Sequence, residues 1–277
     1  MANSRRILYA IGLILASIDT LAKADLPGQK IYKNPVEISS YNLMFTKIKA
    51  NGREALALID SGSSRPIEIS STLARELNIS LTEDKTKTIR GHDGKPFYLS
   101  NGHLQTLAIG DYVTRNVDIE VAGDHIDNIV KQVKTGFEVI LGWTFLSQSY
   151  VLIDYKNLIL QFSDTPIEFG DSSISIGYSV TNNVPIVKGV FEIGEVNLLF
   201  DTGAPMCNID AEYVNTQAGD KVSREISLGG HTLALEWRVK DLSVIRTSLG
   251  SVGVIGNNLL NRYAVYFDTK KKVIHLF

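Results

Sequence analysis

The feature that most constrains the fold of this 277-residue chain is a pattern that occurs twice. An apolar segment runs into Asp60-Ser61-Gly62 in the first half and into Asp201-Thr202-Gly203 in the second. Farther along, each copy has a second apolar segment that ends on a glycine, Gly142 or Gly256. In both copies an aspartate lies 12 residues after that glycine. A repeat of this kind predicts two similar units related by a pseudo-twofold axis.

The segments around these motifs predict an all-β protein. They are short, rich in β-branched residues or alternating in polarity, and separated by turn pairs such as Asn-Gly and Gly-Gly. Each copy begins with a predicted β-hairpin, in which residues 43–49 or 185–191 turn through a glycine into the motif strand. Short helices are expected only over residues 71–77, 128–134, 211–216 and 257–262.

The boundary between the two copies is predicted from composition. Residues 166–175 include a proline, a glycine and three serines, which is typical of a linker rather than a core element. The predicted organisation is therefore a first unit at residues 25–165, a linker at 166–175 and a second unit at 176–277.

The N-terminal residues 1–24 have the pattern of a secretory signal peptide. Arg5 and Arg6 precede an apolar run over residues 7–18, and Ala22-Lys23-Ala24 supplies a small-residue cleavage pattern. That run is shorter than the roughly 20 residues a membrane span requires. We therefore expect a secreted or periplasmic protein. The alternative is a signal segment that is not cleaved, and the protein would contact a membrane only through that segment.

Composition and spacing argue against several functions. There are 28 Lys and Arg residues against 30 Asp and Glu, a net charge of −2, so nucleic acid is not an expected partner. The single cysteine, Cys207, cannot form an internal disulfide and is expected to be buried. The five histidines lack the spacing of metal ligands, and 123–127 is expected to be a polar loop, so no metal is predicted. Asp154 and Asp268 follow apolar strands at turns and are expected to be structural.

Two Asp-Ser/Thr-Gly loops related by a twofold axis would bring Asp60 and Asp201 together. Two adjacent carboxyl groups do not both ionise at low cost, so one keeps a proton while the other is charged. Around one water molecule, such a pair supplies a base for the water and an acid for a peptide carbonyl. The Ser61 and Thr202 hydroxyls can lock the loops together. The expected chemistry uses a catalytic water and no other cofactor.

These motifs resemble those of two-lobed aspartic proteases of the pepsin and retropepsin type over most of residues 40–277, and a compact bacterial retropepsin-like enzyme is the nearer comparison. The resemblance implies two pseudo-twofold-related acid-protease lobes of six to seven strands each, with a few short helices. It implies a catalytic pair, Asp60 and Asp201. It also implies that two glycines, Gly142 and Gly256, pack beneath the loops. The residues that support the pair within the loops are then Ser61, Gly62, Ser63, Thr202, Gly203 and Ala204.

Pepsins cover the site with a hairpin called the flap. The corresponding hairpin here is expected over residues 89–99, and its candidate substrate-binding residues are Gly94, Phe97 and Tyr98. The second copy has a candidate hairpin over residues 226–235 around Gly229 and Gly230, so a flap from each lobe is a further expectation.

The two loops differ after the glycine, where Ser63 has a hydroxyl that can donate to its aspartate and Ala204 does not. We hypothesise that losing this donor raises the affinity of the pair for its proton and moves activity nearer to neutral pH than in a pepsin.

The expected function is peptide-bond hydrolysis by a monomer acting on peptides or unfolded proteins. The alternatives are an inactive aspartic-protease-like module that binds peptides or proteins, and a duplicated fold in which the two aspartates are only structural.

Overall fold

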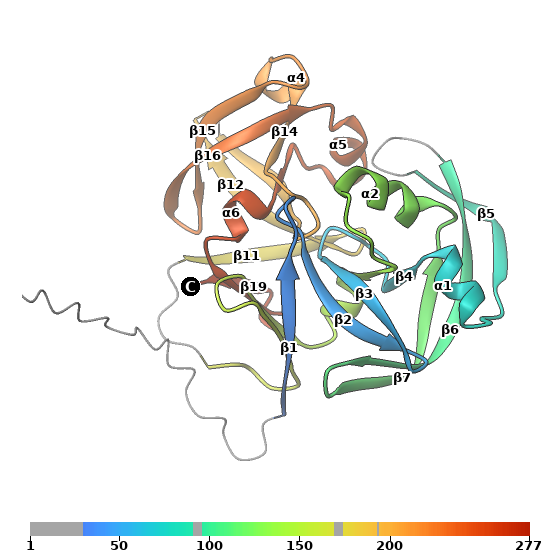
Figure 1. The fold of residues 1–277 in the computed structure, drawn as a ribbon. Coiled ribbons are helices and arrows are strands. Elements are labelled where there is room, and N and C mark those ends of the chain that lie inside the picture. Colours follow the sequence, from blue (N-terminus) through green and yellow to red (C-terminus); the bar gives the residue numbers. More distant parts are fainter. Residues whose placement is uncertain (1–29, 91–95, 169–173, 193) are drawn as a thin grey trace, which may run out of the picture.

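The structure is a computed structural model that describes residues 30–90, 96–168, 174–192 and 194–277 (Figure 1). For residues 84–90, 96 and 97 only the backbone is described. The predicted signal peptide, residues 1–24, lies outside the described residues. None of the helices in the described part of the chain has the length and apolar character that a membrane span needs.

The N-terminal lobe is a mostly antiparallel sheet with short helices packed against it (Figure 1). Its β2–β3 hairpin turns at Asn51 and Gly52, which both have the positive φ that a type I′ turn requires. Strand β8 pairs in parallel with β3 and antiparallel with β4, and so lies between them. The elements are β1 (Ile31–Ile38), β2 (Met44–Ala50), β3 (Arg53–Asp60), β4 (Ile67–Ile69), α1 (Ser71–Glu76), β5 (Thr82–Arg90), β6 (Pro96–Ile109), β7 (Tyr112–Val121), α2 (His125–Val133), β8 (Val139–Gly142) and α3 (Trp143–Leu146).

The C-terminal lobe repeats this plan. Strand β17 pairs in parallel with β13 and antiparallel with β14, as β8 does with β3 and β4. The internal sequence repeat is therefore a structural repeat, and the predicted all-β fold with a few short helices is confirmed. The elements are β11 (Ile174–Thr181), β12 (Val184–Phe191), β13 (Gly194–Phe200), β14 (Asn208–Asp210), α4 (Ala211–Val214), β15 (Lys221–Leu228), β16 (His231–Lys240), α5 (Ser243–Leu249), β17 (Gly253–Ile255) and α6 (Asn257–Leu260).

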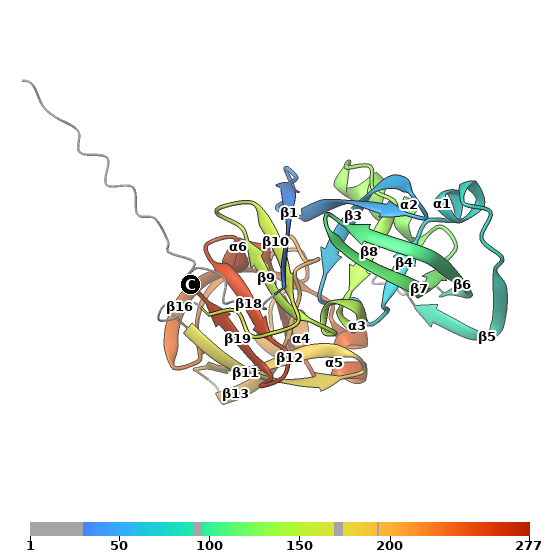
Figure 2. The same cartoon turned by 90° about the horizontal axis from the view of Figure 1, so that it is seen from below.

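A third sheet joins the two lobes (Figure 2). We call it the interlobe sheet. It contains β9 (Tyr150–Asp154), β10 (Ile159–Ser163), β18 (Ala264–Asp268) and β19 (Val273–Leu276), with parts of β1 and β11 at its edges. Its strand order is β1-β10-β9-β18-β19-β11, and the pseudo-twofold axis passes between β9 and β18.

The ends of the interlobe strands adjust two sequence expectations. Strand β11 begins at Ile174, inside the predicted linker 166–175, because Ile174 is buried and pairs with Leu276. Asp154 and Asp268 close the β9–β10 and β18–β19 turns as expected. Asp154 accepts backbone N–H groups at 3.0 and 2.8 Å, and Asp268 accepts one at 3.0 Å.

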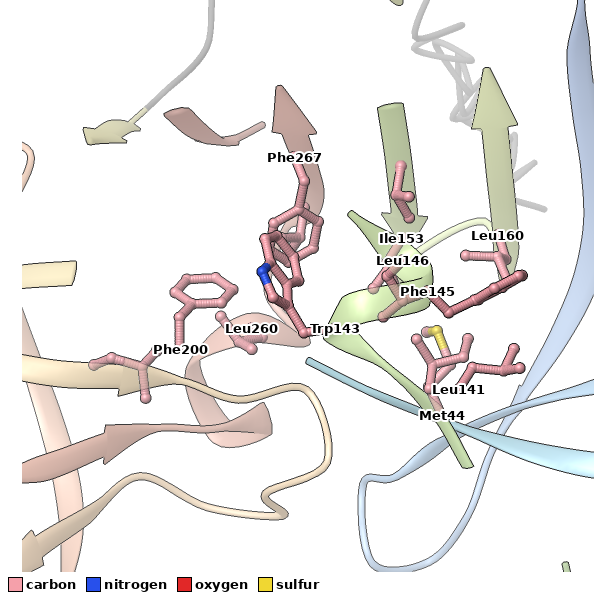
Figure 3. Close-up of a cluster of buried hydrophobic side chains, with 14 of the residues drawn as sticks. Met44, Leu141, Trp143, Phe145, Leu146, Ile153, Leu160, Phe200, Leu260 and Phe267 are labelled. Atoms are coloured by element: carbon pink, nitrogen blue, oxygen red, sulfur yellow. The ribbon is translucent and has the colours of Figure 1, made fainter. Parts of the chain in front are cut away.

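The main core continues from one lobe into the other across this sheet (Figure 3). Trp143 belongs to α3 of the N-terminal lobe, but its indole ring packs beside Phe267 and Phe200, which come from β18 and β13. The ring centroids of Trp143 and Phe267 are 5.1 Å apart, and those of Phe200 and Phe267 are 5.6 Å apart. The packing of aromatic rings thus fixes the two lobes against one shared sheet.

We expect Trp143→Ala to destabilise the whole chain, because it removes the ring that packs in the core shared by both lobes. The cost should be about 3–5 kcal/mol in the free energy of unfolding. Urea denaturation followed by far-ultraviolet circular dichroism measures it. Tyr98→Ala, which removes a side chain that is 66% exposed, is the control and should change this value little. A similar loss in both variants would contradict the packing argument.

Candidate active site

The two Asp-Ser/Thr-Gly loops are held from below by the predicted glycine motifs. Asp60 at the end of β3 is level with Gly142 at the end of β8. A Cβ atom at Gly142 would overlap the carbonyl oxygen of Arg65, and one at Gly256 would overlap the carbonyl of Met206. Only glycine leaves room for the chain to pass this closely, so these two positions do pack beneath the loops.

Reciprocal hydrogen bonds lock the two loops together. The Ser61 hydroxyl donates to the Phe200 carbonyl at 2.8 Å, and the Thr202 hydroxyl donates to the Ile59 carbonyl at 2.9 Å. Each hydroxyl oxygen also accepts the other residue's backbone N–H, at 3.0 and 2.9 Å. Ser61 and Thr202 are both fully buried. These bonds are strong constraints because a buried hydroxyl or carbonyl without a partner is costly.

This lock brings Asp60 and Asp201 together, as the repeat predicts. A Cβ atom added to Gly62 would overlap the Asp201 carboxyl carbon, and one added to Gly203 would overlap that of Asp60. Each motif glycine therefore lies against the carboxyl group of the opposite lobe. The two carboxyl groups also share a hydrogen bond with each other.

Backbone N–H groups orient both carboxyl groups. Asp60 Oδ1 accepts from Gly62 at 2.9 Å and from Ser63 at 3.0 Å, and Asp201 Oδ1 accepts from Gly203 at 2.8 Å. The expectation that the Ser63 hydroxyl distinguishes the two loops needs correction, because Ser63 contacts Asp60 through its backbone. Ala204 has the same backbone N–H group. The absence of a hydroxyl from its side chain therefore removes no hydrogen bond of the kind that Ser63 makes.

Electrostatics separates the two aspartates. Burial raises the pKa of Asp60, while hydrogen bonds from Asp201 and from backbone N–H groups oppose that increase. Burial also raises the pKa of Asp201, and the nearby charge of Asp60 raises it further, so it lies well above the ordinary value. The two carboxyl groups therefore share a proton above the ordinary pKa of an aspartate, and the neighbouring charge adds to the rise at Asp201. The side chains of both residues are partly exposed.

The first predicted flap forms a hairpin of β5 and the first part of β6, in which Arg90 pairs with Pro96 and Thr88 pairs with Tyr98. The Tyr98 side chain is 66% exposed. Phe97 lies on β6 opposite Ile89, and Gly94 lies outside the described residues.

The second predicted flap, around Gly229 and Gly230, is wrong. These residues form the tight turn between β15 and β16, and Gly229 lies so close to the Ser175 carbonyl of β11 that a Cβ atom would overlap it. In the N-terminal lobe, Gly110 in the turn between β6 and β7 lies against Asn34 of β1 in the same way.

Sheet pairing shows which hairpins correspond. Strand β16 pairs in parallel with β14, as β7 does with β4, and β15 pairs with β12, as β6 does with β2. The β15–β16 hairpin is therefore the counterpart of β6–β7 and not of the flap. Only residues 215–220 separate α4 from β15, so this described stretch holds no hairpin equivalent to β5 and the start of β6.

The prediction of a polar loop over residues 123–127 is wrong for 125–127, because α2 begins at His125 and these residues form its first turn, where His125 belongs to a partly buried ionic cluster. His125 Nδ1 lies 2.7 Å from Glu68 Oε1, Arg65 is paired with Glu68, and Arg65 Nε lies 3.2 Å from Glu120 Oε2. The His125 charge also favours the ionised form of Asp60, which slightly opposes the rise in the pKa of Asp60. Across the residues that the structure describes, no three His, Cys, Asp or Glu side chains gather as a metal site.

Residues 46–148 match the family model described as gag-polyprotein putative aspartyl protease. Over these residues the chain is similar to retropepsin-like aspartyl proteases. The match covers Asp60 and Gly142 of the N-terminal lobe, and Asp201 lies beyond it. No curated protein matches the chain. A protease-like function and peptide substrates agree with this family match.

We expect Thr202→Val to lower the free energy of unfolding by about 2–5 kcal/mol, because it removes the hydroxyl that bonds two buried backbone groups, Ile59 C=O and Ser61 N–H. Thr202→Ser keeps the hydroxyl and should recover most of the loss. Urea denaturation of both variants measures the effect. An equal loss in the two would mean that the methyl group, rather than the hydrogen bonds, supplies the stability.

We expect Asp201→Asn to stabilise the protein at pH 7. A raised pKa means that the folded chain keeps a proton that the unfolded chain releases above its ordinary pKa, so wild-type stability falls as pH rises from about 4 toward the folded pKa. Asparagine does not titrate, and the advantage of the variant should therefore shrink toward pH 3. Thermal unfolding from pH 3 to 8 tests this, and a difference independent of pH would contradict it.

Proposed function

We propose that the protein is an aspartic endopeptidase that hydrolyses peptide bonds with a water molecule activated by Asp60 and Asp201. The observation that carries the proposal is the reciprocal packing of each motif glycine against the opposite carboxyl group, which sets both carboxyls at one point on the pseudo-twofold axis. A pair that only stabilised the fold would not need to remain partly exposed.

In this proposal the two carboxyl groups have different roles, which the surroundings of each one support. Asp60 is the charged member and acts as the general base, because its hydrogen bonds oppose the increase that burial causes in its pKa. Asp201 is the protonated member and acts as the general acid, because burial and the charge of Asp60 both raise its pKa. Two groups with separated pKa values can supply a base and an acid at the same pH.

The reaction follows from these roles. Asp60 removes a proton from the water as its oxygen attacks the peptide carbonyl carbon, and Asp201 donates its proton to the carbonyl oxygen. The resulting tetrahedral diol collapses as its C–N bond breaks. The nitrogen receives the proton held by Asp60, and Asp201 recovers a proton from a diol hydroxyl. The products are a carboxylic acid and an amine, and the pair returns to its starting state.

The substrate is proposed to be a peptide or an unfolded protein, which the aspartyl protease family match supports. Both aspartates come from one chain, so a monomer suffices for the reaction. The N-terminal residues support a secreted or periplasmic location after removal of residues 1–24.

Residues 25–277 should cleave members of a mixed peptide library between pH 3 and 8, with an optimum above pH 4 because burial raises both pKa values. Mass spectrometry of the products identifies the cleaved bonds. Asp60→Asn and Asp201→Asn should each abolish cleavage, because either one removes a member of the acid-base pair.

The control is Asp154→Asn, at a partly exposed turn residue outside the carboxyl pair, and this variant should cleave like wild type. Cleavage that persists in both dyad variants would assign hydrolysis to another group or to a contaminant. A folded wild-type protein that cleaves nothing but retains peptides in a pull-down would favour the binding module over the enzyme. An optimum well below pH 4 would count against the raised pKa values.

A further inference from the structure

One peptide group in the Asp201 loop is held on both sides. Its N–H belongs to Gly203 and donates to Asp201 Oδ1 at 2.8 Å. Its C=O belongs to Thr202 and accepts from the side-chain amide of Asn257 at 2.8 Å. The N–H and C=O of a trans peptide point in opposite directions within one rigid plane. Whatever fixes the Thr202 carbonyl therefore also aims the N–H that holds the Asp201 carboxyl.

Asn257 is itself held by a residue from the other half of the chain. Tyr155, which follows β9, donates its hydroxyl to Asn257 Oδ1 at 2.8 Å. The Thr202 carbonyl can only accept, so Nδ2 of Asn257 must face it and Oδ1 must face the tyrosine. Asn257 is fully buried and Tyr155 is 4% exposed, so water does not compete for these bonds. The Asp201 charge also contributes to raising the pKa of Tyr155, which agrees with their proximity.

The Asp60 loop provides an internal comparison. Trp143 and Asn257 follow Gly142 and Gly256, the glycines beneath the two loops, and their backbone N–H groups make the same bond in both lobes. Trp143 donates to the Ser63 carbonyl at 2.8 Å, and Asn257 donates to the Ala204 carbonyl at 2.9 Å. The side chains differ, because the Trp143 ring packs with Phe267 and Tyr178 in the core. The side-chain bond to the loop carbonyl is therefore a feature of the Asp201 lobe.

We propose that Asn257, held by Tyr155, is a positioning residue that fixes the Thr202–Gly203 peptide and through it the Asp201 carboxyl group for hydrolysis. This inference rests on the proposed endopeptidase function and deepens it, since it names a group outside the carboxyl pair that orients one of the two carboxyls. Neither Asn257 nor Tyr155 has to touch the substrate for this effect.

The consequence for Asp201 has a definite direction. An N–H group that donates to a carboxylate favours the ionised form, and a carbonyl that is itself hydrogen-bonded makes the N–H of the same peptide a better donor. Removing the Asn257 amide weakens this bond, so the pKa of Asp201 should rise further. In the proposed mechanism, the loss of that proton ends activity at high pH. The alkaline limit of the activity profile should therefore move upward, while loss of alignment lowers the rate.

The test uses Asn257→Ala and Tyr155→Phe in residues 25–277. We expect kcat for a library-derived peptide to fall about 10- to 100-fold in Asn257→Ala and less in Tyr155→Phe, with KM changed little, because alignment rather than binding is lost. The alkaline limb of the pH–kcat profile should move to higher pH in both. Carbon-13 NMR titration of labelled aspartate carboxyls should show the higher apparent pKa of the pair moving the same way.

Matched controls separate positioning from stability. Asn34→Ala removes a buried asparagine that bonds Thr46 and Lys47, and Tyr266→Phe removes a hydroxyl that accepts the Ile167 N–H. Both should lower the melting temperature without moving the alkaline limb or the NMR titration. If all four variants lose only stability and the titration of the pair is unchanged, the inference is overturned.

The two proposals fail in different ways. If wild-type protein is folded and cleaves nothing, the endopeptidase function fails, while the NMR titration still decides whether Asn257 sets the proton affinity of Asp201. If wild type cleaves and the Asn257→Ala profile and titration match it, only the positioning role fails.

Discussion

The hydrogen bonds between the Ser61 and Thr202 loops are the constraint on which the rest of the structure depends. Each hydroxyl is buried and bonds only groups of the opposite loop. Neither loop can satisfy these groups alone, so each lobe completes the other. The carboxyl pair, the glycines that lie against it and the interlobe sheet all follow from bringing these two loops to one axis.

Around that axis the molecule is symmetric in its backbone and asymmetric in the groups that decide chemistry. The N-terminal lobe has the β5–β6 hairpin and puts Trp143 into the shared core, whereas the C-terminal lobe has Asn257 at the matching position. Because the lobes are covalently linked, each copy could diverge without disturbing the other. In a dimer of two identical subunits around such an axis, every substitution would occur in both halves, so the two halves could not differ in this way.

The sequence predicted the features that local patterns determine. The Asp-Ser/Thr-Gly loops, the glycines beneath them, the turn roles of Asp154 and Asp268 and the first flap hairpin all depend on residues near one another in the chain. Helix α5 was not predicted, and it begins without a side-chain cap at Leu242. Asp241 accepts the backbone N–H of Ser243 at its start, and the helix covers a small apolar cluster that includes Leu199 and Val254, which local sequence does not reveal.

Other features could not be predicted because they depend on distant partners. A Gly-Gly turn between two strands looks the same whether the hairpin covers a cleft or packs against β11, and only the parallel pairing of β14 with β16 distinguishes the two. The bond from Tyr155 to Asn257 joins residues 102 positions apart. No local pattern marks either residue as a partner of the Asp201 loop.

The interlobe sheet also determines the order in which the molecule can be assembled during synthesis. Strand β11 opens the C-terminal lobe, yet it pairs with β19, so Ser175 bonds to a histidine 100 residues later in the chain. Closing so long a loop is slow, and domains generally begin to fold from the N-terminus as the ribosome releases them. The N-terminal lobe can therefore form early, whereas the opening strand of the second lobe waits for residues made much later. A partly synthesised chain holds Asp60 without Asp201 until the second motif has been made, and the sheet that fixes the two lobes against each other is complete only with the last strand of the chain.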